Sequence, residues 1–275
     1  MTIRSKVAEV RINFSAVDQH NNVAAVRPDD FAIVDRDLVV RNFRSFSRSD
    51  YARLEIAVLV DVSTSVATEF RQELAGVDQL VNRTTGVPDE GFSVVSFQDA
   101  KPTAVCEDNC RSMNAETRFP VAPRGGVTPL YDSIAFASNL LARRGDVHTR
   151  KILILFSDGA DTISLKSLSD ATQSALAQEI AIYSVDLSPQ PHSSPGTLVL
   201  RGLAANTGGR YFPVEAGLAR LLQAVVEDFH ATYTVTYKLP NHAAGFHPVR
   251  ILPTHDLSLQ FHCRCGYYYP TNPEE

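Results

Sequence analysis

The sequence lacks the features that mark several classes of protein. No stretch approaches the ~20 consecutive apolar residues that a membrane helix requires. Residues 1–7 contain no apolar core of a secretory signal, although a chain that begins after a removed signal would look the same. Internal repeats and low-complexity segments are also absent. We therefore expect the chain as given to be soluble and folded.

Charge of one sign is not concentrated anywhere in the sequence. The formal net charge is -5, from 26 Lys and Arg against 31 Asp and Glu, and there is no run of like charges. This distribution offers no electrostatic footprint for nucleic acid or an anionic membrane. Because 44% of the 275 residues are apolar, the chain can bury a core in one or two domains. Partners are expected to be proteins or small charged ligands.

Cysteine is scarce, and the four cysteines form two close pairs. Cys106 and Cys110 lie in a polar, turn-rich stretch that can bring their Cα atoms within disulfide range, so we expect this pair to form a disulfide. Cys263 and Cys265 would lie about 6.6 Å apart on an extended strand, at the edge of that range. This second pair could form a disulfide or stay reduced. A zinc site built from all four thiolates lacks the usual two-residue spacings and is disfavoured.

The two ends of the chain predict strands and no helix. Residues 7–14 alternate apolar and polar side chains, which is the period of a strand with one buried face. Further strands are predicted at 31–35 and 38–43, and after residue 230 at 233–239, 248–252 and 257–268.

Between the ends, strands alternate with helices. Residues 54–60 form a nearly continuous apolar run, which is typical of a strand buried on both faces. Strands are also expected at 91–97, 151–156, 180–187 and 210–213, with helices at 66–82, 129–143, 165–178, 198–205 and 216–230. This alternation predicts an α/β fold with a doubly wound, mostly parallel sheet and helices on both faces. The economical architecture inserts this domain, 53–231, into a β-sandwich formed by 1–52 and 232–275.

A group of oxygen donors follows the first buried strand. Asp61, Ser63 and Ser65 are spaced by two, at the carboxyl edge where open α/β sheets place their ligands. A carboxylate and two hydroxyls are hard donors that suit Mg²⁺ or Mn²⁺ and suit Zn²⁺ poorly. Alternatively, Ser63 or Ser65 serves only to cap the next helix.

Two further segments supply donors at the same edge. Thr128 directly precedes a predicted helix that has Pro129 in its first turn. At this position Thr128 could cap the helix or bind a metal ion. Asp158 follows the strand 151–156, within Ser157-Asp158-Gly159, which also reads as an ordinary turn.

Together the three segments closely resemble the metal-ion-dependent adhesion site of von Willebrand factor A domains, including integrin inserted domains. The resemblance covers roughly 54–229, with three separated motifs in the right order. It implies one divalent cation, Mg²⁺ or alternatively Mn²⁺ or Ca²⁺, held by five residues: Asp61, Ser63, Ser65, Thr128 and Asp158. The flanks, with Asp30-Phe31-Ala32-Ile33-Val34 and Gly266-Tyr267-Tyr268, resemble bacterial and particularly acidobacterial secreted members, which implies a secreted, periplasmic or cell-surface protein.

The resemblance implies protein binding and no catalysis. An Asp or Glu of a partner protein would complete the coordination of the ion, with Thr128 switching between direct and water-mediated contact. Family members couple this site to sliding of the last helix, here 216–230, which leads directly into the strand 233–239. The rival from another class is a metal-dependent hydrolase, for which His192 is the histidine placed at the same edge. The other rival is a scaffold whose metal only stabilises the fold.

Overall fold

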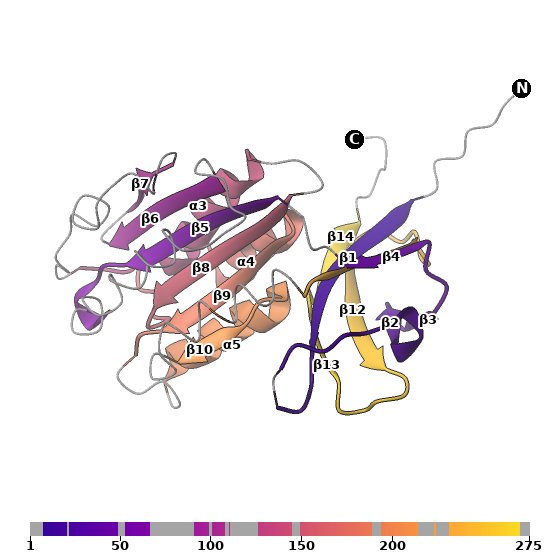
Figure 1. Ribbon diagram of the computed structural model, residues 1–275. Coiled ribbons are helices and arrows are strands. Elements are labelled where there is room, and N and C mark those ends of the chain that lie inside the picture. Colours follow the sequence, from indigo (N-terminus) through magenta and orange to yellow (C-terminus); the bar gives the residue numbers. More distant parts are fainter. Residues whose placement is uncertain are drawn as a thin grey trace, which may run out of the picture. The chain divides into compact units, whose positions relative to one another are not determined.

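The computed structural model in Figure 1 divides the chain into two compact units. A terminal unit contains Met1–Asp50 and Glu227–Glu275, and a central unit contains Tyr51–Val226. The structure describes residues 8–20, 22–48, 53–66, 91–98, 101–107, 110, 126–144, 149–188, 194–213, 223 and 231–269.

The central unit is built on a six-stranded sheet with the order β10-β9-β8-β5-β6-β7. Five strands are parallel: β5 (Leu54–Asp61), β6 (Phe92–Gln98), β8 (Arg150–Ser157), β9 (Ile180–Asp186) and β10 (Tyr211–Pro213). The edge strand β7 (Lys101–Cys106) pairs antiparallel with β6. The sequence did not predict β7, because it is short, half exposed and contains Pro102, which argues against a strand except at an edge.

The parallel strands are continuous apolar runs because both of their faces are covered. Every residue of β5 is buried. On one face, the helices α3 (Leu130–Ala142), α4 (Leu168–Ala177) and α5 (Pro195–Thr207) share a core with the strands. The opposite face is equally buried, as Val58 and Ile154 show. Two of the predicted helices lie almost entirely outside the described residues. Of the helix predicted at 66–82, only Val66 is described, and it belongs to the 3₁₀ turn Thr64–Val66. Of the helix predicted at 216–230, only Gln223 is described.

The start of α4 differs from the prediction. The helix was expected to begin at Leu165 and begins at Leu168, because the Ser167 hydroxyl accepts a hydrogen bond from Asp170 N while the Asp170 carboxylate accepts one from Ser167 N. Leu165 therefore belongs to a loop and not to the apolar face of a helix.

The terminal unit consists of two four-stranded antiparallel sheets. One contains β1 (Glu9–Val17), β4 (Ser45–Arg48), β11 (Tyr233–Lys238) and β13 (Gln260–Cys263), and the other contains β2 (Phe31–Asp35), β3 (Leu38–Val40), β12 (Gly245–Pro253) and β14 (Gly266–Tyr269). The sheets share one core that includes Phe14, Phe31 and Tyr233. Strands β1 and β11 pair with each other, so segments more than 200 residues apart form one sheet. The predicted α/β fold with a sandwich from both termini is confirmed.

The terminal unit also corrects two expectations. Residues 28–30 form a 3₁₀ turn in a region where no helix was predicted. The single strand predicted at 257–268 is two strands, β13 and β14, which belong to different sheets. At Gly266 an added Cβ would meet the His247 carbonyl oxygen, so glycine allows β14 to approach β12 closely.

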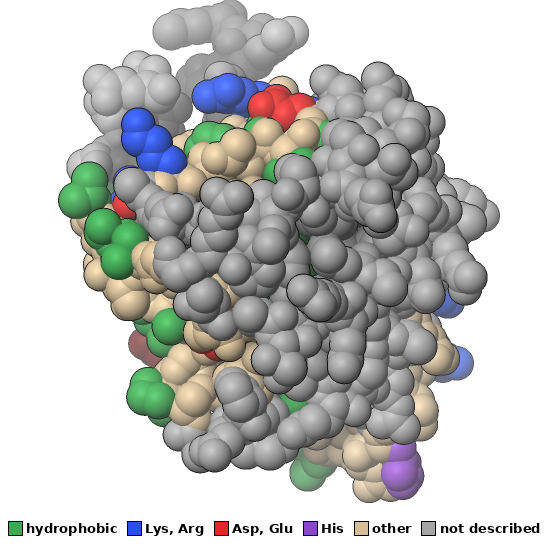
Figure 2. All heavy atoms as spheres, turned by 90° about the vertical axis from the view of Figure 1, so that its left-hand side faces the viewer, with side chains coloured by type: hydrophobic (Ala, Val, Ile, Leu, Met, Phe, Trp, Pro, Cys, Tyr) green, Lys and Arg blue, Asp and Glu red, His purple; other side chains and the backbone are tan. Residues whose placement is uncertain are grey.

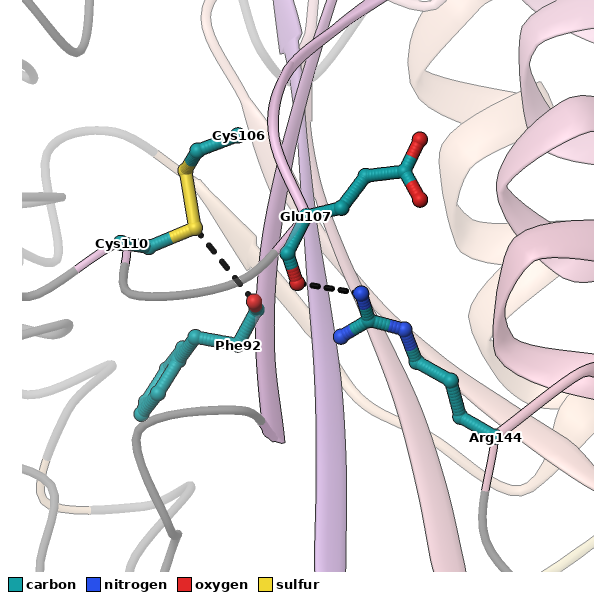
Figure 3. The surroundings of a disulfide bond; sticks show 5 residues. All are labelled: Phe92, Cys106, Glu107, Cys110 and Arg144. Atoms are coloured by element: carbon teal, nitrogen blue, oxygen red, sulfur yellow. Dashed lines mark hydrogen bonds between the residues drawn. A yellow bond between two sulfur atoms is a disulfide. The ribbon is translucent and has the colours of Figure 1, made fainter.

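The two cysteine pairs differ in redox state. Cys106 and Cys110 form a disulfide with Cα atoms 5.7 Å apart (Figure 3). Its Cys110 sulfur contacts the Phe92 carbonyl oxygen at 3.3 Å, and Arg144 at the end of α3 donates a hydrogen bond to the carbonyl oxygen of Glu107. These contacts hold the bridge at the amino edge of the parallel sheet.

Cys263 and Cys265 are free thiols at the crossing between β13 and β14. Burial raises the pKa of Cys263 to about 12 and also raises that of Cys265. The disulfide and these two thiols exclude a zinc site built from all four cysteines.

A carboxylate buried in the terminal unit holds its two sheets together. Asp35 Oδ2 accepts hydrogen bonds from the hydroxyls of Tyr237, at 2.8 Å, and Tyr267, at 2.7 Å. His247 Nδ1 lies 3.5 Å from Asp35 Oδ1, and its Nε2 lies 2.6 Å from the Ala243 carbonyl oxygen. Burial, followed by the nearby Asp35 charge, raises the pKa of Tyr237 well above its usual range, so the phenol stays a donor.

Replacing this acceptor tests its contribution. For Asp35→Ala we expect the free energy of unfolding to fall by about 2 to 5 kcal/mol, because two buried hydroxyls lose their acceptor. Glu9→Ala is the control, since Glu9 pairs with Arg44 at the surface, where removing an ion pair costs about 0 to 1 kcal/mol. Urea unfolding followed by circular dichroism measures both. Equal losses in the two variants would show that the buried network contributes nothing.

Candidate metal site

Three loops of the central unit meet at the carboxyl edge of the parallel sheet. The arrowheads of β5, β6 and β8 point to this edge in Figure 1. Strand β5 ends at Asp61 and the neighbouring strand β8 ends at Ser157, with Val60 opposite Phe156 in the register. Asp158 thus follows β8 directly beside the end of β5, as the sequence predicted.

Asp61 is a fully buried carboxylate. Its Oδ1 accepts a hydrogen bond from Ser63 N at 2.9 Å, and its Oδ2 accepts one from the Ser157 hydroxyl at 2.8 Å. Burial raises the pKa of Asp61 to about 6, and the charge of Asp158 contributes in the same direction. Within the described part of the chain, no Lys or Arg forms an ion pair with this carboxylate.

The hydroxyls of Ser63 and Ser65 lie side by side, with their Oγ atoms 3.0 Å apart. Ser63 is buried and Ser65 is exposed. In an octahedral Mg²⁺ site with bonds of about 2.0 to 2.1 Å, two adjacent ligand oxygens lie about 2.9 Å apart. The two hydroxyls share a hydrogen bond at this distance, and the same spacing would suit two neighbouring ligands of one ion. The helix that these serines would alternatively cap lies outside the described residues.

Thr128 is buried but does not cap α3, because the helix begins at Leu130 and its N-cap position is Pro129. Its backbone pairs with Thr162: Thr128 N donates to Thr162 Oγ1 at 2.6 Å, and Thr162 N donates to the Thr128 carbonyl at 2.9 Å. Among the described contacts, none involves the Thr128 hydroxyl. This arrangement joins the Thr128 loop to the loop that carries Asp158.

Asp158 lies in a tight turn, so the alternative reading of this segment as a turn is also correct. Asp158 Oδ1 accepts a hydrogen bond from Ala160 N at 2.9 Å, and Ser157 Oγ accepts one from Gly159 N at 3.0 Å. Ser157 therefore links Asp61 to the turn that carries Asp158. In the sequence Ser157 is recognisable only as part of a turn, although its place at the end of a buried strand indicates a position beside the end of β5.

Comparisons with known proteins support the fold. No family model and no curated protein matches the chain. Among solved structures, the chain is similar to proximal thread matrix protein 1 of the mussel byssus, in a structure with a zinc-occupied MIDAS motif. The TM-score is 0.50 at 17% sequence identity, and the match covers 71% of this chain and 50% of the mussel protein. The central unit has the von Willebrand factor A (VWA) fold, and is therefore the VWA unit of the chain. A von Willebrand factor type A structure from Catenulispora acidiphila has a TM-score of 0.49 at 13% identity, over 99% of this chain and 76% of that one.

The chain spans about half the length of the mussel protein. The resemblance of the flanks to acidobacterial secreted proteins and the five metal ligands stay predictions. No helix in the described part of the chain is long and apolar enough to cross a membrane.

The VWA unit has a further buried carboxylate at this edge, Asp186, which no sequence motif marks. Asp186 ends β9, and its two oxygens accept four hydrogen bonds, from Ser188 N, Ser188 Oγ, Thr197 Oγ1 and Tyr211 OH. These occupy the acceptor sites of a carboxylate. Burial raises the pKa of Tyr211 to about 12, which keeps its donor in place. Asp186 therefore fastens α5 and β10 to β9 and has no free lone pair for a ligand.

Two glycines of the VWA unit allow α5 to approach the Asp158 turn. Gly159 has a positive φ of 79°, and an added Cβ there would meet the Gly196 carbonyl. An added Cβ at Gly196, in the first turn of α5, would meet the Asp158 carbonyl. The position of the Asp158 backbone thus depends on this contact.

We expect Gly196→Ala to destabilise the VWA unit by about 1 to 3 kcal/mol, because backbone must move to admit the methyl group. Gly202→Ala on the same helix is the matched control: nothing lies within 4 Å of its added Cβ, and alanine favours a helix by up to about 1 kcal/mol. Urea unfolding of both variants gives the comparison. A stabilised Gly196→Ala would contradict the close contact.

Proposed function

We propose that the VWA unit, with the boundaries 53–231, is a divalent-metal-dependent protein-binding module that serves adhesion or assembly. Asp61, Ser63, Ser65, Thr128 and Asp158 would hold Mg²⁺, or alternatively Mn²⁺ or Ca²⁺. Carboxylate and hydroxyl oxygens are hard donors, which suit these ions.

One observation carries the proposal: a fully buried carboxylate has two adjacent hydroxyl groups beside it and no described cationic partner. Taking a carboxylate out of water is costly unless a charge or several hydrogen bonds compensate. Ser63 N and Ser157 Oγ supply hydrogen bonds and orient Asp61. The Ser63 and Ser65 oxygens at 3.0 Å supply two more donors of the hard type.

When bound, the ion supplies positive charge and a coordination position that the protein leaves open. The five proposed ligands would leave one coordination position of the ion open to a further ligand. Because only Asp61 and Asp158 carry charge, the hydroxyl ligands leave the ion electrophilic toward a further carboxylate. An Asp or Glu of a partner protein suits that position. The chain's own residues orient the donors: Ser157 links Asp61 to the Asp158 turn, and Gly196 lets α5 pack against that turn.

Binding without catalysis fits the residues available. A hydrolase needs a side chain that acts as a base toward a water molecule. Six of the eight histidines belong to the terminal unit: His20, His230, His242, His247, His255 and His262. His148 and His192, the candidate at the carboxyl edge, lie outside the described residues.

We also propose that the protein works outside the cytoplasm, as a secreted, periplasmic or cell-surface protein. The Cys106–Cys110 disulfide supports this location, because such bonds persist in oxidising compartments.

Metal titration tests the proposal. We expect Mg²⁺ and Mn²⁺ to bind metal-stripped protein in calorimetry and to raise its melting temperature, since a ligand at 100 times its Kd adds about 2.7 kcal/mol of stability. Asp61→Ala should lose both effects. Asp256→Ala is the control, because Asp256 is an exposed carboxylate of the terminal unit whose bonds are to Ser258.

No metal binding in the parent protein would remove the proposed function and leave only the fold. If metal binds and raises the melting temperature, but a partner later binds equally with and without chelator, the metal is structural and the scaffold alternative holds.

A further inference from the structure

The strand β3 of the terminal unit exposes apolar side chains along an unpaired edge. Hydrophobic side chains at several separate places on a surface are ordinary, as Figure 2 shows for the described part of one face. In β3, however, Leu38 is 46% exposed and Val39 is 61% exposed on a strand that, among the described strands, pairs with β2 alone and ends its sheet. The side of β3 that faces away from β2, its outer edge, therefore offers backbone groups next to apolar side chains.

Two edge strands of the VWA unit carry residues that oppose further pairing, and β3 does not. β7 begins with Lys101 and Pro102, and β10 ends at Pro213. Proline lacks the N–H of a strand ladder, and lysine at an edge disfavours a new neighbouring strand. β3 consists of Leu, Val and Val, so its outer edge is suited to pairing with a further strand.

The turn before β3 determines which of its backbone groups point outward. β2 and β3 form a hairpin (Figure 1) in which Asp35 lies opposite Leu38, with Arg36 and Asp37 between them. Both turn residues have a positive φ, 44° and 71°, as a two-residue type I′ turn requires. The residues that flank such a turn are hydrogen-bonded to each other, and the direction of the backbone groups alternates along the strand. The N–H and C=O of Leu38 therefore point to β2, and those of Val39 point to the outer edge.

A second copy of the chain offers a matching edge. In an antiparallel pair centred on the outward backbone groups, Val39 would lie opposite Val39 of the second copy. Asp37 of each copy then lies opposite Arg41 of the other, because each is two residues from Val39. Both side chains are exposed, and opposite charges across a strand pair attract. A shift of the pairing by two residues in either direction removes these two attractions.

The other charges near β3 are compatible with this register. Arg36, in the turn, would lie opposite Asn42 of the second copy, so like charges do not meet there. Arg250, on the outer face of the same sheet, lies two strands from the edge, since it pairs with Val34 and Val34 pairs with Val39.

We infer that the outer edge of β3 is a dimerisation site, at which two copies of the chain pair antiparallel about Val39 and join their sheets into one. The inference is independent of the metal site and adds a partner, a second copy of the chain. Because the edge is short, the contact is small, and we expect a concentration-dependent dimer with a Kd of roughly 10⁻⁶ to 10⁻³ M. Such a dimer would carry two VWA units.

Charge reversal tests the register. Arg41→Glu would bring two carboxylates together at both ends of the strand pair, and Asp37→Lys would bring two cations together. In sedimentation equilibrium of the full chain, each variant alone should dimerise at least about tenfold more weakly than the parent, since like charges in direct opposition are costly. An equimolar mixture of the two variants should dimerise again, because each end of the mixed pair then joins opposite charges.

Two further variants separate the edge from other causes of association. Val39→Lys should abolish the dimer, because it places two cations at the centre of the pair. Leu257→Lys changes another leucine of the terminal unit, 81% exposed and in a turn, and should dimerise like the parent. Melting temperatures close to that of the parent would show that the variants fold.

Three results would overturn the inference. The first is a parent that stays monomeric up to about 1 mM, which would leave the edge to a strand of another protein. The second is a dimer that Val39→Lys does not weaken. The third is a mixture of Arg41→Glu and Asp37→Lys that associates no more strongly than either variant alone.

Discussion

The carboxyl edge of the parallel sheet depends on one buried carboxylate. Asp61 ends a strand with no exposed residue, and its two oxygens are oriented by Ser63 N and Ser157 Oγ. Burial raises the pKa of Asp61 to about 6, because an ionised carboxylate is disfavoured away from water. A divalent cation at the proposed site would offset that penalty. The neighbouring loops converge on Asp61, because Ser157 connects it to the Asp158 turn and the Ser63 and Ser65 hydroxyls lie 3.0 Å apart beside it.

Much of this fold is predictable because its strongest signals are local. The run 54–60 is apolar because β5 is covered on both faces, and Ser157-Asp158-Gly159 marks the end of β8. Other features depend on contacts that one sequence does not reveal. β7 is a short edge strand with Pro102, so its pattern is weak. The break between β13 and β14 results from a crossing between two sheets, which Gly266 permits by its contact with His247.

In the candidate site too, some residues are predictable from local sequence and others depend on contacts between distant segments. Donors that occur in motifs, such as Asp61 and Asp158, could be selected from spacing and from the resemblance alone. Residues that position these donors could not be selected in this way. The role of Gly196 depends on its approach to the Asp158 carbonyl, about 40 residues away in sequence. Likewise, the apolar pattern extends the predicted helix to Leu165, whereas α4 begins after the Ser167 cap. Asp186 was overlooked because a strand-end aspartate without a neighbouring motif carries no distinct signal, and its four hydrogen bonds give it a structural role.

Anomalous diffraction from crystals grown with Mn²⁺ would locate the proposed ion directly. We expect one strong peak at the carboxyl edge of the sheet, about 2.0 to 2.3 Å from the oxygens of Asp61, Ser63 or Ser65 and close to Thr128 and Asp158. A peak elsewhere, for example between Asp132 and Asp161, or no peak at saturating Mn²⁺, would contradict it.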